Sequence, residues 1–130
     1  LIFIIIPSFK SEKFIERCIL SVQNQTYKDY EHLIIIQGDI DETKSICEKY
    51  AKNDKRIKLF YTPENSNLCI NRNIGIKNAH GNYIALLDAD DEYKPFYLKE
   101  LINAANESKS DLILASGVRK GKTWETTRLK

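Results

Sequence analysis

The sequence predicts an α/β domain with a mostly parallel, Rossmann-like sheet that has helices on both faces. Short β-rich runs alternate with helical patterns along the chain. The runs are continuously apolar, as in parallel strands that are covered on both sides. Strand–helix–strand units form right-handed crossovers, which wind such a sheet into a doubly wound domain. The length of 130 residues suits one domain with one core, so we expect residues 1–130 to form a single domain.

Each expected strand is a short run of apolar residues. The first run is expected to end at Pro7, because proline is unfavourable inside a central strand. The expected strands cover residues 2–6, 33–36, 57–61, 83–87 and 112–115.

Four helical patterns lie between and after these strands. Ser11 is expected to cap the first helix, and Asp41 or Thr43 to begin the second. The third pattern covers residues 68–78, and Pro95 suits the first position of the fourth helix. After Ser116 the pattern gives way to a polar segment, so we expect residues 117–130 to be a poorly defined tail.

The composition excludes several classes of protein. A net charge of +2, with 29% charged and 42% apolar residues, argues against a disordered chain, a collagen or a nucleic-acid-coating protein. The apolar runs are shorter than the roughly 20 residues of a membrane span. Three cysteines without a metal-binding spacing indicate a reduced, cytoplasmic chain that uses them as small apolar residues. Because the sequence contains no methionine, we expect it to be part of a longer protein.

Polar residues follow the first, second and fourth strands, at the edge where parallel α/β sheets bind ligands. In an extended segment Asp88 and Asp90 share one face and Asp91 points away. Two converging carboxylates favour a divalent cation such as Mg²⁺ or Mn²⁺, and small Ala89 leaves room for a ligand. The alternative is an acidic turn that caps the helix after Pro95.

Two other side chains near this edge have alternative interpretations. Arg72 could pair with a phosphate group through two hydrogen bonds, or form an ordinary surface salt bridge. Phe9 could stack on a nucleobase, or belong to the core.

Four motifs, in order along the chain, resemble the family 2 inverting glycosyltransferases of the GT-A fold. They are IIIPSFK at 4–10, CILSVQNQTY at 18–27, ENSNLCINRNIG at 64–75 and GNYIALLDADD at 81–91. The resemblance extends from about residue 1 to residue 102 and implies a nucleotide-sugar donor, usually a UDP-sugar, with a divalent metal (Mn²⁺ or Mg²⁺). It further implies a glycan or lipid-linked acceptor, and a cytoplasmic protein that can work peripherally at the inner membrane face in building cell-surface polysaccharide. Nucleic acid is not an expected partner.

The resemblance also assigns roles to individual residues. The loop that packs on the nucleoside is matched by Pro7, Ser8 and Phe9. Asp88 matches the first aspartate of the DxD motif, near the ribose, and Asp90 the aspartate that binds the metal. Arg72 matches the arginine of the Arg-Asn-x-Gly segment beside the nucleotide.

The chain departs from the family pattern after the second strand. Where the family commonly has Asp-Asp-Gly-Ser, this chain has Gln37, Gly38 and Asp39, which is one residue shorter. The acid that reads the uracil edge is therefore replaced by Gln37 or displaced to Asp39, which leaves uridine specificity open.

The second departure concerns catalysis. The family's general base lies downstream, and the residues after Ser116 do not match it, so we assign no catalytic residue and expect a donor-binding part of a longer glycosyltransferase. The alternative is a module that binds nucleotide sugars without turnover. Residues 117–123 (GVRKGKT) superficially resemble a P-loop, but three residues separate the glycines where that motif needs four.

Overall fold

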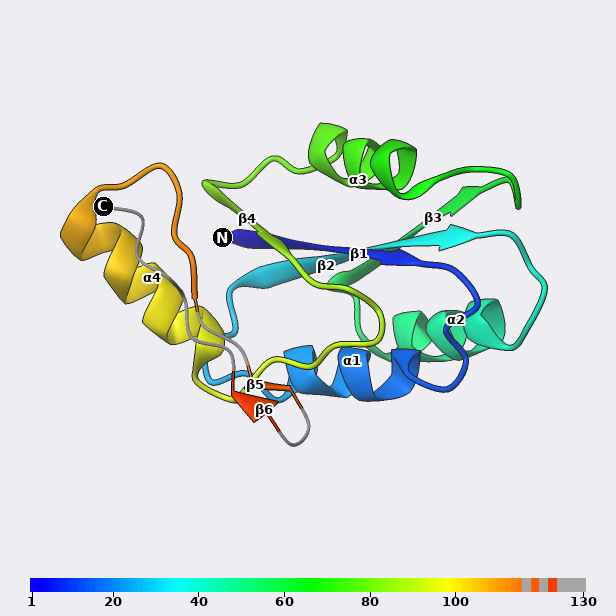
Figure 1. The fold of residues 1–130 in the computed structure, drawn as a ribbon, viewed down its shortest axis with the longest axis horizontal. Helices are drawn as coiled ribbons and strands as arrows, with labels where there is room; N and C mark the ends of the chain where they lie inside the picture. Colours follow the sequence, from blue (N-terminus) through cyan, green and yellow to red (C-terminus); the bar gives the residue numbers. More distant parts are fainter. Residues whose placement is uncertain (116–117, 120–121, 124–130) are drawn as a thin grey trace.

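A computed structural model of the chain describes residues 1–115, 118–119 and 122–123 and confirms the predicted α/β architecture (Figure 1). The strands are β1 (Ile2–Ser8), β2 (Tyr30–Gln37), β3 (Ile57–Thr62) and β4 (Tyr83–Leu86), followed by the short β5 (Val118–Arg119) and β6 (Lys122–Thr123). The helices are α1 (Ile15–Gln23), α2 (Thr43–Asn53), α3 (Leu68–Lys77) and α4 (Tyr97–Ser108). The predicted tail, residues 117–130, falls mostly outside the described residues.

The main sheet has the order β3-β2-β1-β4, and each neighbouring pair of strands is parallel. The chain starts in the middle of the sheet, moves outward through β2 and β3, and then returns to the other side of β1. This change of direction places a topological switch point between β1 and β4. Ligands bind at such a point, beyond the carboxyl ends of the strands.

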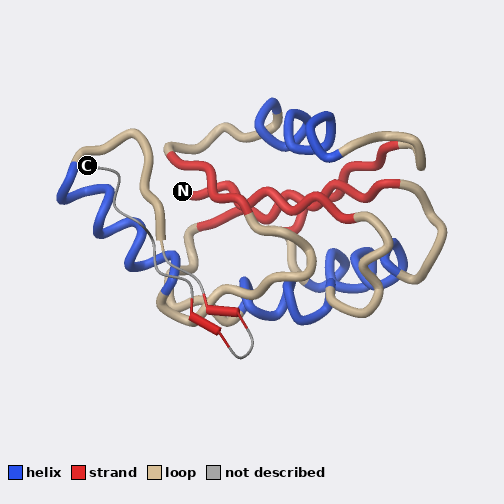
Figure 2. The backbone as a smooth tube through the Cα atoms, in the orientation of Figure 1, coloured by secondary structure: helices blue, strands red, loops and turns tan. Residues whose placement is uncertain are grey.

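Helices cover both faces of the sheet: α3 lies on one face, and α1 and α2 lie on the other (Figures 1 and 2). The side chains of β1 alternate accordingly. Ile4 and Ile6 pack toward α1 and α2, whereas Phe3 and Ile5 belong to the cluster beneath α3. Helix α3 approaches β1 closely at Gly75, where an added Cβ would lie 2.5 Å from Cγ2 of Ile5.

The predicted strand at 112–115 is wrong. These residues form no strand in the structure, and the side chains of Leu112 and Leu114 are 72% and 70% exposed. The apolar run has high strand propensity, but a strand also needs a partner with which to form a ladder of hydrogen bonds. Residues 112–115 have no such partner within the described part of the chain.

Two predicted helix starts need correction, and one is confirmed. Ser11 does not cap α1, because its hydroxyl donates to the carbonyl oxygen of Phe9 and the helix begins only at Ile15. Pro95 is not the first residue of the fourth helix, because α4 begins two residues later, at Tyr97. The carbonyl oxygen of Pro95 instead accepts from the N–H of Thr26, which joins this segment to the α1–β2 connection. Helix α2 begins at Thr43, as predicted.

The cysteine prediction holds for two residues of three. Cys18 and Cys47 are buried, but Cys69, near the start of α3, is exposed, and all three are free thiols. Burial raises the pKa of the Cys47 thiol to about 12, as expected for a cysteine packed in a core. In the part of the chain that the structure describes, no helix is long and apolar enough to cross a membrane.

Candidate functional site

Two adjoining cavities open at the carboxyl ends of β1, β2 and β4. The first has a volume of about 310 Å³ and is lined by Pro7, Ser8, Phe9, Gln37, Ser66, Asn67, Leu68 and Asn71. The second has a volume of about 350 Å³ and is lined by Pro7, Phe9, Lys10, Ser11, Phe14, Leu68, Asp88, Ala89 and Asp90. Pro7, Phe9 and Leu68 line both cavities, so the two adjoin and together form one candidate site at the switch point.

The loop after β1 exposes an aromatic ring to both cavities. Phe9 is 44% exposed, so its assignment to the core is wrong and its ring is available for stacking. Lys10, the next residue, has a left-handed backbone (φ 49°), and its Nζ lies 5.2 Å from the centroid of the Phe9 ring. Helix α2 braces this loop, because the N–H of Ser11 donates to Oγ1 of Thr43 over 2.8 Å.

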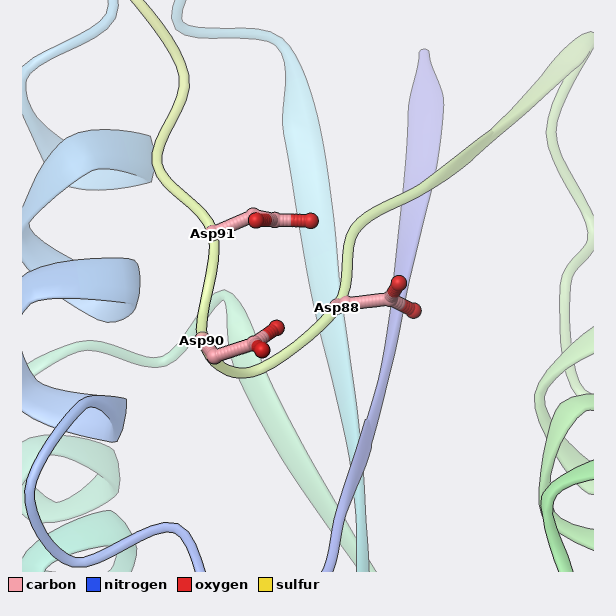
Figure 3. A group of neighbouring side chains, drawn as sticks. All are labelled: Asp88, Asp90 and Asp91. Carbon is pink, nitrogen blue, oxygen red and sulfur yellow. The ribbon is translucent and has the colours of Figure 1, made fainter. Parts of the chain in front are cut away.

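The acidic segment after β4 is a turn, closed by the N–H of Asp91, which donates to the carbonyl oxygen of Asp88 over 3.0 Å. The expectation that Asp91 points away is therefore wrong, because the alternation of an extended strand does not apply within a turn. The carboxylates of Asp88, Asp90 and Asp91 project to the same side of the turn (Figure 3), and oxygens of all three lie within 4.8 Å of one another.

The turn does not cap α4, since that helix begins six residues after Asp91 with Phe96 at its N-cap. Its carboxylates instead interact among themselves. Burial, with Asp90 and then Asp88 as further causes, raises the pKa of Asp91. Three clustered carboxylates supply the hard oxygen ligands that Mg²⁺ and Mn²⁺ take, so these residues fit the predicted cation.

Arg72 of α3 lies beside this turn. Its guanidinium donates to Oδ1 of Asp88 over 3.1 Å, so the salt-bridge interpretation of Arg72 is confirmed. Its Nε is buried without a hydrogen-bond partner among the described residues. Arg72 stands outside the lining of both cavities, but the ion pair connects it to the second one.

Of the three residues predicted at the end of β2, only Gln37 lines a cavity. The side-chain amide of Gln37 lines the first cavity and forms three hydrogen bonds with protein atoms. Gly38 has a left-handed φ of +69° and packs on Glu64. Asp39 is exposed and forms an ion pair with Lys44 over 3.8 Å. Gly38 and Asp39 are not among the residues that line the cavities.

Several lining residues were not identified from the sequence. The first cavity takes Ser66, Asn67, Leu68 and Asn71 from the start of α3, and the second takes Lys10, Ser11 and Phe14. A signal for part of this set exists in the sequence: an asparagine directly before an apolar helical pattern is typical of an N-cap. In the structure, Oδ1 of Asn67 accepts from the N–H of Ile70 in this way.

Comparisons with known proteins show which family the sequence and the fold resemble. The family model described as "Glycosyl transferase family 2" matches residues 3–130. An uncharacterized glycosyltransferase of Haemophilus influenzae is 42% identical over 91 residues, which are 70% of this chain and 36% of that protein. The uncharacterized glycosyltransferase EpsJ of Bacillus subtilis is 37% identical over 113 residues, 87% of this chain and 33% of that protein.

A third relative has a more specific name. The GalNAc(5)-diNAcBac-PP-undecaprenol beta-1,3-glucosyltransferase of Campylobacter jejuni is 35% identical over 105 residues, 80% of this chain and 34% of that protein. Among solved structures, residues 1–349 of S. aureus TarS superpose with a TM-score of 0.78 at 26% identity, covering 85% of this chain and 33% of that one. The same protein in complex with UDP gives a TM-score of 0.72. The chain thus spans about a third of the length of each of these three relatives.

Proposed function

The chain belongs to glycosyl transferase family 2 and has the Rossmann-like GT-A fold, and on this premise we propose that it forms the donor-binding part of a glycosyltransferase. The donor is a nucleotide-diphosphate sugar, with a UDP-sugar as first choice. The observation that carries the proposal is that the two cavities adjoin at the exposed side chain of Phe9, while Asp88 and Asp90 of the carboxylate cluster line the second one. TarS, similar over 85% of this chain, has been crystallised with UDP and with UDP-GlcNAc, which supports this choice.

The donor nucleoside is placed in the first cavity, with its base on the ring of Phe9. The diphosphate then extends into the second cavity toward the acidic turn. Among the donor-binding residues expected from the sequence, Pro7, Ser8, Phe9, Gln37, Asp88, Ala89 and Asp90 line the two cavities and are the proposed contacts. Arg72 is proposed to act through its ion pair with Asp88, whereas Gly38 and Asp39 lie outside both linings.

Asp90 is the proposed metal ligand, and the turn brings Asp88 and Asp91 near enough to support it. A divalent cation there, when bound, neutralises negative charge on the departing diphosphate. Arg72 contributes a fixed positive charge at the same end of the donor, and its ion pair orients the carboxylate of Asp88.

The reaction itself joins an acceptor hydroxyl to the sugar. The bond between the anomeric carbon and the diphosphate oxygen breaks while the acceptor oxygen attacks in line from the opposite face, which inverts the configuration. The hydroxyl proton passes to a general base, and we assign no residue of this chain to that role. The residues described here bind the donor and stabilise its leaving group.

The proposed acceptor is a glycan or a lipid-linked sugar, and the proposed place of action is the cytoplasm, including the inner membrane face. Two relatives support this part of the proposal. The Campylobacter jejuni enzyme is named for an undecaprenol-linked substrate, and a Bacillus subtilis relative is named as a putative teichuronic acid biosynthesis glycosyltransferase.

Nucleotide release from a panel of UDP-sugars and GDP-sugars, measured on the intact protein with Mn²⁺ and membrane extracts as acceptor source, tests the proposed activity. We expect UDP release that depends on both acceptor and metal. Metal-dependent donor binding without any release, over the full panel, would instead favour the module that binds without turnover.

A further inference from the structure

Both donor hydrogens of the Gln37 side chain, and one lone pair of its oxygen, are used within the protein. Its Nε2 donates to the carbonyl oxygens of Glu64 (2.9 Å) and Ser66 (2.8 Å), and its Oε1 accepts from Nδ2 of Asn71 (2.9 Å). Chemistry settles the orientation of this amide, because two carbonyl oxygens can only accept and therefore require the NH₂ group. Gln37 thus uses both of its donor hydrogens within the protein.

The same network continues through a buried residue of α3. Oδ1 of Asn71 accepts from the hydroxyls of Thr62 (3.0 Å) and Ser66 (2.9 Å), and Asn71 is only 1% exposed. The end of β2, the end of β3 and the first turns of α3 are therefore joined by side-chain hydrogen bonds. A buried network in which each group is paired holds its members rigidly.

The backbone independently favours contact between the end of β2 and the segment that leads into α3. The N–H of Ser66 donates to the carbonyl oxygen of Pro63, which closes a turn over residues 63–66. Gly38 packs on this turn with a positive φ, and a Cβ added to it would lie 3.3 Å from Cα of Glu64. The end of β2 is thus shaped to receive the turn that leads into α3.

We propose that Gln37 is a positioning residue: it holds the 63–66 turn in place, and with it the wall of the first cavity formed by Ser66, Asn67 and Leu68, and its amide group donates no hydrogen bond to the nucleobase. This inference rests on the proposed donor-binding function. The positioning role also explains why glutamine stands at position 37 where the family commonly has an acidic residue. A carboxylate that faced the carbonyl oxygens of Glu64 and Ser66 would have no hydrogen to donate to either of them.

Hydrogen exchange of the backbone amides of Ser66, Ile70 and Asn71, which are hydrogen-bonded in the turn and at the start of α3, tests the positioning role when measured on the intact protein without nucleotide. We expect Gln37→Ala to accelerate this exchange about tenfold or more, since it leaves two carbonyl groups and Asn71 without their partner. Gln23→Ala, on α1, is the matched control and leaves the exchange of these three amides unchanged. Unchanged exchange in Gln37→Ala, together with weaker UDP binding, would overturn the proposal in favour of direct contact with the nucleotide.

Thr62 gives a test that does not touch the cavity lining. Thr62→Val removes a hydroxyl that reaches Asn71, so we expect UDP affinity to fall severalfold, with Thr62→Ser close to the parent protein. Faster exchange in Gln37→Ala and Thr62→Val with unaltered UDP affinity would also overturn the proposal. If the parent protein binds none of the nucleotides tested, the donor-binding function fails, and the exchange measurement still decides whether Gln37 holds the turn.

Discussion

The guanidinium of Arg72 on α3 donates to the carboxylate of Asp88 at the end of β4, and this 3.1 Å contact bridges the two elements beside the topological switch point. Helix α3 comes close enough for the contact because Gly75 lets it rest on Ile5 of β1. Arg72 neutralises only Asp88 in this cluster. Asp90 and Asp91 form no ion pair with a cationic side chain among the described residues.

Replacing Arg72 by alanine should change two affinities in opposite directions. The acidic turn becomes more negative, so Mn²⁺ alone should bind about two- to fivefold more tightly, the scale of a half-exposed ion pair. UDP in the presence of Mn²⁺ should bind more weakly, because a cation beside the diphosphate is lost. Calorimetric titrations of the intact protein with each ligand measure both changes. Arg72→Lys keeps the charge, so both of its affinities should lie between those of the parent protein and of Arg72→Ala. If Arg72→Ala weakens the binding of Mn²⁺ as well as that of UDP, Arg72 acts mainly by maintaining the structure of the acidic turn.

Phe9 should matter for nucleotide affinity and little for stability. Its ring is 44% exposed, so Phe9→Ala removes modest apolar burial but deletes the proposed stacking surface for the base. Base stacking on an aromatic ring contributes about 1–3 kcal/mol, so UDP affinity should fall roughly five- to hundredfold. Phe9→Trp should retain binding. Phe96→Ala, at a ring that is 57% exposed next to α4, is the control and should leave UDP affinity unaltered.

His32 on β2 should make the protein sensitive to mild acid. It is fully buried, neither ring nitrogen has a partner among the described residues, and burial lowers its pKa from 6.5 to about 3. Between these two pH values the unfolded chain binds a proton that the folded chain does not. Stability therefore falls as the pH drops below about 6.5, with a slope of at most about 1.4 kcal/mol per pH unit from this group.

Urea unfolding of the intact protein between pH 5 and pH 7.5 measures this dependence. His32→Leu should flatten it, while His80→Asn, at the exposed histidine, should leave it in place. Asp54 acts at lower pH: hydrogen bonds from Arg56 lower its pKa from 3.8 to about 2, so its contribution is lost only as the pH falls through that range. An equally steep dependence in His32→Leu would assign the acid sensitivity to other groups.

The local pattern predicted β1 to β4 because each is a short run rich in apolar residues that pairs with a neighbouring strand. Burial differs among them, since β1 is fully buried whereas most residues of β4 are exposed. The local pattern failed at residues 112–115, where the same kind of run has no paired strand, since pairing depends on residues elsewhere. It also placed Asp91 wrongly, because the turn arises from a hydrogen bond between backbone atoms of Asp88 and Asp91 that residue types do not reveal.

The sequence predicted the part of the candidate site that follows directly from the order of the strands. Residues directly after β1 and β4 reach the cavities because they follow the strands of the switch point. The role of Gln37 could not be predicted from its neighbours in sequence, because its partners Glu64 and Ser66 lie 27 and 29 residues away. The lining of the first cavity by α3 likewise depends on how that helix packs against β1.

Titration of the intact protein with UDP, with and without Mn²⁺, tests the central claim most directly when repeated on Asp90→Ala. The predicted result is UDP binding that requires Mn²⁺ and is lost in Asp90→Ala, while Glu107→Ala, an exposed acid on α4, binds as the parent does. Binding of UDP that is indifferent to both the metal and Asp90, or no binding of UDP at all, would contradict the assignment of the acidic turn and the two cavities as the donor site.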